Sequence, residues 1–235
     1  MNGIDGIGTR ERQWGMSADV NASELEEDTE RSLVGDIRTG LETDFVVRGE
    51  QVVFQGDDDA QFAVIRADVS PADDAGTGDA SEDAPVYPVY FAQVRGGQPS
   101  VVCVAVRPDG RILLVRHWRI ATDSYEWEFP RSLGEPDMIA GATAEYELMK
   151  ETGIRPLSHR TLQMIHADTG KLRDSIAVVE LRVASDRADA AMLNDPRLQW
   201  LEPAEFDEMV RAGNIMDGVT LSAYLIWRTR AEGGA

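Results

Sequence analysis

Two glutamates spaced four residues apart are the clearest chemical feature of the chain. Glu147 and Glu151 lie in a helix-compatible segment that Gly153 closes. Residues at this spacing project from the same face of a helix, so both carboxylates can reach one site at its end. Hard divalent cations prefer clustered carboxylate oxygens. The spacing therefore permits one shared metal site, although by itself such a pair more often marks acids on a solvated helix face.

The surrounding stretch, Trp127 to Ile154, reads W-E-F-P-R-S-L-G-E-P-D-M-I-A-G-A-T-A-E-Y-E-L-M-K-E-T-G-I. It resembles the signature of the Nudix hydrolases, which is a glycine, five residues, an acid, seven residues and then R-E-U-x-E-E-x-G-U, where U is aliphatic. Aligned on Gly153, this signature places Glu151 on its last acid and Glu147 on the acid after the arginine. The resemblance implies that both are catalytic metal ligands for Mg²⁺ or Mn²⁺.

Four positions depart from that signature. Ser132 stands at the first glycine and Met138 at the first acid, while Tyr146 replaces the arginine and Lys150 the middle acid. An ammonium beside the expected site competes for the same carboxylates, so the affinity for Mg²⁺ should fall. Lys150 also lies three residues after Glu147, a spacing that an ordinary surface ion pair would explain.

Acids in two loops could supply what the helix lacks. Glu135 and Asp137 precede the helix and could substitute for the missing first acid. The segment A-D-T-G at 167–170 resembles the loop that covers the active site in the ADP-ribose pyrophosphatase branch of the family. Asp168 or Asp174 could provide the base there, and an ordinary polar loop is the alternative.

Arginines at a strand end are the candidates for substrate contacts. The segment L-L-V-R-H-W-R at 113–119 resembles the aliphatic strand of the same branch, which ends in an arginine that contacts the substrate. By this resemblance Arg119 would bind the diphosphate or nucleotide, and Arg116 and Glu128 are further candidate substrate contacts. An arginine that only extends to solvent is the alternative for Arg119.

Composition limits the partners. A formal net charge of −19 speaks against binding along a nucleic acid, although a small anion can bind where metal ions or arginines screen it. The single cysteine, Cys103, lies in an apolar run, which predicts a buried small hydrophobe and a reducing compartment. The histidines are scattered, which favours core or surface roles for each: His117, His159 and His166. No apolar run approaches the length of a membrane span, so we expect a cytoplasmic protein.

The patterns predict three parts: an acidic arm at 1–44, with Met16 as an alternative start to Met1, a β-subdomain at 45–97 and a Nudix-like domain at 98–230. Residues 45–54 read as two short strands around a Gly-Glu turn. Residues 70–84 read as a flexible acidic loop, because they offer little to bury. Interleaved strands and helices predict an α/β fold, a mixed sheet with helices on both faces, which is also the α/β/α sandwich that the Nudix resemblance implies.

The closing segment G-N-I-M-D-G-V-T-L-S-A at 213–223 also resembles the pyrophosphatase branch, and within it Asp217 with Thr220 predicts a helix cap. The resemblance implies a metal-dependent hydrolase of a nucleoside diphosphate linked to another moiety, such as ADP-ribose or a nucleotide sugar, that works as a homodimer. The alternative is a Nudix fold without catalysis that binds a nucleotide or a protein. An acidic interaction arm on an inert scaffold is the third hypothesis.

Overall fold

The computed structural model describes residues 45–56, 62–72, 80–134, 138–185 and 195–232. Several predictions fall outside these residues. They concern the acidic arm, the centre of the acidic loop, and the substitute acids Glu135 and Asp137.

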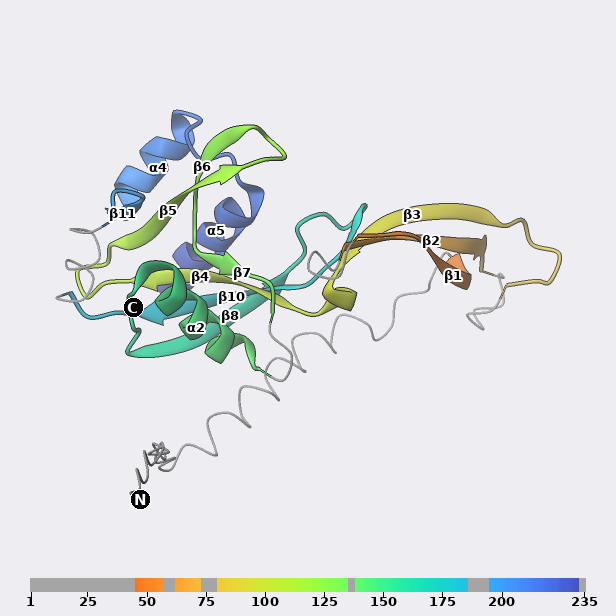
Figure 1. Ribbon diagram of the computed structural model, residues 1–235, viewed down its shortest axis with the longest axis horizontal. Coiled ribbons are helices and arrows are strands. Elements are labelled where there is room, and N and C mark those ends of the chain that lie inside the picture. Colours follow the sequence, from red (N-terminus) through yellow and green to blue (C-terminus); the bar gives the residue numbers. More distant parts are fainter. Residues whose placement is uncertain (1–44, 57–61, 73–79, 135–137, 186–194, 233–235) are drawn as a thin grey trace, which may run out of the picture.

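The N-terminal part is a sheet in the order β1-β2-β3-β9 (Figure 1). The first three strands are antiparallel, whereas the short β9 joins β3 in parallel. The prediction of two strands within 45–54 is wrong, because β1 is one strand. Its pairing with β2 shifts register twice, once beside Gly49, so the Gly-Glu pair marks an irregularity in the ladder and not a turn. The strands are β1 (Phe45–Gln55), β2 (Phe62–Pro71), β3 (Tyr87–Val94) and β9 (Leu172–Arg173).

The larger sheet has seven strands, with β11-β5-β4-β10-β8 as its main path, β6 beside β5 and β7 beside β4. Strand β10 runs parallel to β4 and antiparallel to β8, so the sheet is mixed. Apolar residues fill β4 and most of β10, which lie at the centre, as expected of strands covered on both faces. The strands are β4 (Ser100–Val106), β5 (Ile112–Arg119), β6 (Ser124–Glu128), β7 (Arg131–Ser132), β8 (Ser158–Ile165), β10 (Ile176–Arg182) and β11 (Leu198–Leu201).

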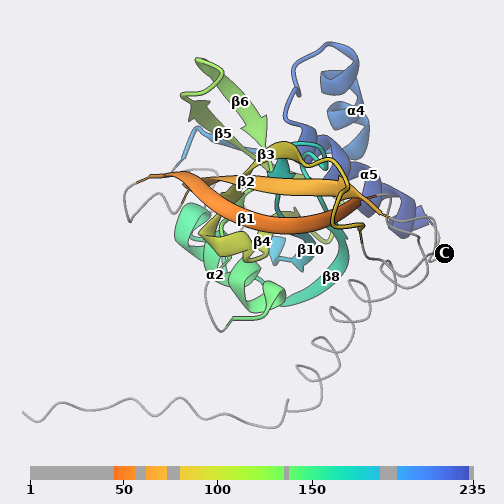
Figure 2. The same ribbon diagram turned by 90° about the vertical axis from the view of Figure 1, so that its right-hand side faces the viewer.

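Helices cover both faces of this larger sheet. One core cluster joins β4, β5 and β10 to α2 (Ala140–Thr152), and the fully buried Cys103 belongs to it as predicted. The other joins the opposite face to α4 (Pro203–Arg211) and α5 (Gly218–Glu232). Figure 2 shows α2 on one side and the two C-terminal helices on the other. The predicted α/β/α arrangement is therefore confirmed.

Strand β9 ties the two sheets together. It belongs to the loop between β8 and β10, yet it pairs with β3 of the N-terminal sheet. Arg173 of β9 donates to Glu50 of β1 through Nη1, with 2.9 Å to Oε2, and its guanidinium lies 4.3 Å from the ring centroid of Phe91. None of the helices in the described ranges is long and apolar enough to cross a membrane.

Candidate active site

The second half of α2 turns both predicted metal ligands toward the sheet. The side chains of Glu147 and Glu151 are only 11% and 13% exposed. Leu148 is fully buried on the same helix, which Gly153 ends in the left-handed conformation with φ of 73°. Burial, and then the charges of the two glutamates, raise the pKa of the Cys103 thiol well above its usual range. The negative charges of both carboxylates therefore act on the region around Cys103, where α2 packs on the larger sheet.

Glu147 has a cationic partner on its own helix. The Nζ atom of Lys150 lies 3.3 Å from Oε2 of Glu147 and 5.9 Å from the ring centroid of Tyr146. The Lys150 side chain is 59% exposed, so it can move away without leaving a cavity. The ion pair expected from the sequence is therefore present, and it covers one of the two acids.

Glu151 contacts a histidine of the sheet, whereas Glu147 pairs with a lysine of its own helix. Nε2 of His117, on β5, lies 2.5 Å from its Oε1 atom. The contact lacks the angles of a hydrogen bond, and in the described part of the chain neither buried oxygen of Glu151 has a hydrogen-bond partner. A buried carboxylate without donors is costly, and a bound cation would remove that cost. This side chain therefore fits a metal ligand.

A second polar cluster lies beside the first, around Glu128 at the end of β6. This carboxylate is 1% exposed and accepts two hydrogen bonds from Arg119, with 2.8 Å between Nε and Oε1. Nη2 of Arg131 lies 3.1 Å from Oε2 of Glu128, and Nη1 of Arg131 lies 3.2 Å from Oδ1 of Asp217. The cluster alternates acids and bases, so its charges are compensated.

Asp217 connects this cluster to α5. Its Oδ2 atom accepts hydrogen bonds from the backbone N–H of Thr220 at 2.9 Å and from the Thr220 hydroxyl at 2.8 Å. Oγ1 of Thr220 in turn accepts the N–H of Phe129 at 3.1 Å. The predicted helix cap is confirmed, and it also fixes the end of β6 to the start of α5.

The two clusters share one electrostatic environment. Hydrogen bonds to Glu128 raise the pKa of Arg119, and the charges of Asp217 and Glu151 add to that effect. Arg119 thus lies close enough to Glu151 for their charges to interact.

A family model described as NUDIX domain matches residues 96–217, a little over half of the chain. The chain belongs to the Nudix family. Among solved structures, it is similar to one described as "Crystal structure of ADP compounds hydrolase", with a TM-score of 0.61 and 17% sequence identity. That similarity covers 83% of this chain and 98% of the other, and at this identity it shows the fold. No curated protein sequence matches.

The predicted membership of the Nudix family is therefore confirmed, and the matched range contains the whole Trp127 to Ile154 stretch, whereas the ADP-ribose pyrophosphatase branch stays a prediction. In this Nudix domain Arg116 lies away from the glutamates. Its guanidinium stacks at 4.8 Å from the ring centroid of Tyr125 and 5.9 Å from that of Trp127. Alternation along β5 places it on the face opposite His117, so its role as a substrate contact remains a prediction.

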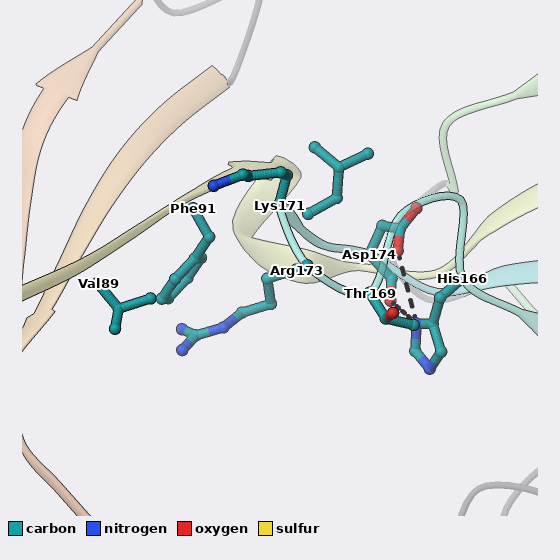
Figure 3. Close-up of a pocket in the computed structure, with 9 residues that line it drawn as sticks. Val89, Phe91, His166, Thr169, Lys171, Arg173 and Asp174 are labelled. Atoms are coloured by element: carbon teal, nitrogen blue, oxygen red, sulfur yellow. Dashed lines mark hydrogen bonds and ion pairs between the residues drawn. The ribbon is translucent and has the colours of Figure 1, made fainter. Parts of the chain in front are cut away.

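Asp168 and Asp174, the two acids of the loop between β8 and β10, accept hydrogen bonds from the backbone of that loop. Oδ1 of Asp168 accepts the N–H of Gly170 at 2.8 Å, and Oδ2 of Asp174 accepts the N–H of Ala167 at 3.0 Å. Dashed lines in Figure 3 join Asp174 to His166. None of the contacts described for these two acids reaches α2. The loop and β3 line a pocket of about 410 Å³, and the residues given for its lining include none from α2 (Figure 3).

Two residues that contact the candidate site residues were not predicted from the sequence: His117 contacts Glu151, and Arg131 contacts Glu128. His117 was grouped with scattered histidines, although alternation on β5 places it on the face of Arg119. Arg131 follows the W-E-F-P segment without any spacing that marks it. Within the described ranges, no three or more His, Cys, Asp or Glu side chains form a group that could hold a metal ion.

Proposed function

We propose that this Nudix domain hydrolyses a nucleoside diphosphate linked to another moiety, in the class of ADP-ribose or a nucleotide sugar. The products would be a monophosphate and a phosphorylated remainder. One observation carries the proposal: at the end of the signature helix, Glu151 presents two buried carboxylate oxygens that have no hydrogen-bond partner among the described residues. The similar structure described as an ADP compounds hydrolase supports the substrate class.

Glu147 and Glu151 would hold a divalent cation, Mg²⁺ or Mn²⁺. Such an ion, when bound, neutralises phosphate oxygens and lowers the pKa of a bound water. Magnesium is often held by only one or two carboxylates together with waters and substrate phosphates, so two protein acids are sufficient. Lys150 must leave Glu147 for this to happen, and its exposed side chain allows that.

Arg119 would orient the diphosphate. Its two hydrogen bonds to Glu128 use two of the five N–H donors of the guanidinium, and the remaining donors can bind a phosphate. Asp168 and Asp174 remain candidate bases, and each now accepts a backbone N–H of its own loop through one of its two carboxylate oxygens. Glu128 holds Arg119 in place and thereby aims it.

The test is AMP release from ADP-ribose with Mg²⁺ or Mn²⁺ by the purified full chain. The wild type should release AMP, and Glu151→Gln, which keeps the shape of the side chain, should lower the rate by roughly a thousandfold or more. Glu208→Gln is the control, because it removes one acid from an exposed position of α4. Equal rates in the wild type and Glu151→Gln would refute the assignment.

The ion pair between Lys150 and Glu147 favours a second candidate, a Nudix fold that binds a nucleotide without hydrolysing it. A ligand that fills a site in the folded state raises the melting temperature. A rise in melting temperature with ADP-ribose but no AMP release would therefore support a binding protein. AMP release that Glu151→Gln abolishes would exclude it.

We also propose that two copies of the chain pair through the N-terminal sheet. Large apolar side chains of this sheet are more than 40% exposed, and an apolar surface of this kind commonly marks an interface. Light scattering should give twice the chain mass of 25.9 kDa, and Phe54→Glu should shift it to the monomer. A monomeric wild type would refute the pairing. The exposed residues are Phe45, Val47, Val52, Val53, Phe54, Tyr87, Val89 and Tyr90.

A further inference from the structure

We propose that Arg173 is a positioning residue for Asp174, the candidate base beside it, and that it acts by tying the loop between β8 and β10 to Glu50 of the N-terminal sheet. The inference rests on the proposed hydrolase function. Arg173 and Glu50 both lie outside the signature stretch and outside the candidate substrate contacts. The N-terminal sheet would thus take part in the reaction by holding this loop in place.

The ion pair joins the two edge strands of the N-terminal sheet. Arg173 belongs to β9 and Glu50 to β1, and β2 and β3 lie between these strands. Nη1 and Nη2 of Arg173 donate to Oε2 and Oε1 of Glu50, so the contact is bidentate. Two parallel hydrogen bonds fix the direction of the partners as well as their distance. The pair therefore orients β9 more strictly than a single hydrogen bond would.

One face of the sheet accommodates this long reach. Glu50, Ala67 and Val89 are direct partners in successive ladders, so their side chains share a face. Phe91 lies on the same face, two residues from Val89, and its ring centroid is 4.3 Å from the Arg173 guanidinium. Figure 3 shows the Arg173 side chain extending past Phe91 toward Val89. The aromatic ring therefore supports the guanidinium on its way to Glu50.

An irregularity in β1 places Glu50 on that face. The ladder with β2 shifts register between Val47 and Gly49, so one residue, Arg48, has no partner in the ladder there. An extra residue of this kind moves every later side chain of a strand to the opposite face. Without it Glu50 would lie on the face away from Arg173. The irregularity beside the Gly-Glu pair therefore makes the contact possible.

The ion pair acts on a carboxylate that keeps one oxygen open. Asp174 follows Arg173 directly in the chain, and its Oδ2 atom accepts the N–H of Ala167 at 3.0 Å. Its carbonyl oxygen lies 2.6 Å from Nδ1 of His166. The remaining oxygen, Oδ1, is buried and has no hydrogen-bond partner in the part of the chain that the structure describes. Asp174 is thus held at its backbone and at one oxygen, while the other can accept a proton.

The backbone attachment of the loop is short, so the ion pair carries much of the hold. Strand β9 pairs with β3 over only two residues, Leu172 and Arg173, and the N–H of Ala92 donates to the carbonyl of Lys171 at 2.8 Å. The side chains of Arg173 and Glu50 are 43% and 35% exposed, and a pair at such exposure adds little to the stability of the whole fold. The position of the loop and the global stability can therefore be tested separately.

Hydrogen exchange in the full chain tests the attachment without reference to activity. Glu50→Gln should speed amide exchange at Ala92, whose N–H donates to the loop, by roughly two- to fivefold, and should leave the larger sheet unchanged. The reversed pair, Glu50→Arg with Arg173→Glu, should restore slow exchange. Arg66→Gln is the matched control and should change nothing, because the pair of Arg66 with Asp68 lies on the same sheet at similar exposure, 40% and 38%.

AMP release from ADP-ribose tests the positioning. Arg173→Gln should lower kcat by roughly 10–100-fold and leave KM within about twofold, because a displaced base slows the chemical step without removing a binding contact. Arg173→Lys keeps the charge but not the bidentate contact and should fall between the two. The reversed pair should recover most of the lost kcat, and Arg66→Gln should keep the wild-type values.

Unchanged exchange in Glu50→Gln, or a change in KM alone in Arg173→Gln, would overturn the inference, as would a loss of kcat that the reversed pair does not recover. If Arg173→Gln fails to fold, Glu50→Gln decides, and its kcat should fall by about tenfold. The proposed hydrolysis fails separately. A wild type that releases no AMP refutes the hydrolase, whereas AMP release with equal kcat in all variants refutes only the role of Arg173.

Discussion

Two acidic clusters lie side by side in this Nudix domain, and they differ in whether their charges are satisfied. Around Glu128 every acid faces an arginine or a helix N-terminus, and the links run from β5 through β6 to α5. The Glu151 side chain is more exposed, at 13% compared with 1% for Glu128, yet its two buried oxygens have no hydrogen-bond partner in the described part of the chain. The sequence gives both clusters the same residue type, and their surroundings separate them.

The difference indicates distinct roles. A satisfied buried network rigidifies the fold and can hold an arginine in a fixed direction. A buried carboxylate without hydrogen bonds destabilises the folded state. Such a group is expected where a ligand binds. The domain thus combines a rigid support with a carboxylate to which the proposed function assigns a cation, and each half can be tested separately.

The largest expected effect separates the clusters by stability. Glu128→Gln should lower the free energy of unfolding by about 2–3 kcal/mol, because it removes the charge that Arg119 and Arg131 share. Glu151→Gln should change it little, since its carboxylate makes no hydrogen bond with the residues that the structure describes. Urea unfolding at neutral pH measures both. An equal loss in the two variants would mean that Glu151 is also structural and would erase the contrast.

A second substitution tests the cluster around Glu147 and Glu151. Lys150→Glu removes the ammonium from Glu147 and restores an acid, so the affinity for Mg²⁺ should rise by about tenfold in calorimetric titrations. The double variant with Met138→Glu should also gain turnover. Arg211→Glu is the control, because Arg211 faces Glu208 at the same spacing on α4. If the double variant binds metal yet gains no turnover, the defect lies elsewhere in the site.

The smallest expected effect on stability concerns the exposed ion pair of Glu50 and Arg173, which can be compared with the buried network around Glu128. Hydrogen bonding to Arg173 lowers the pKa of Glu50 below its usual 4.5. The pair therefore stabilises the fold above that value, and the contribution is lost as the pH falls through the lowered pKa. Because both side chains are partly exposed, Glu50→Gln should cost at most about 1 kcal/mol at neutral pH.

Urea unfolding of Glu50→Gln and the wild type over a pH series measures this contribution. The difference between them should vanish in acid and shrink in high salt. A difference that grows in acid would contradict the assigned sign. A loss as large as that of Glu128→Gln would contradict the distinction between exposed and buried pairs.

Much of the fold was predictable from local patterns. The apolar runs of β4 and β10 and the helix that ends at Gly153 follow from periodicity within a few positions. The spacing of Glu147, Lys150 and Glu151 also placed them on neighbouring positions of one helix. The single strand β1 was missed, because a Gly-Glu pair signals a turn as readily as an irregular ladder.

The sequence by itself determined which residues share an element and a face. Only the tertiary structure brought His117 of β5 to Glu151 of α2, and linked Glu128, Arg131 and Asp217 across three segments. It also showed that Asp168 and Asp174 bind their own loop. The physical reason is that periodicity acts over a few residues, whereas contacts between elements depend on strand order and helix packing, which are properties of the whole core.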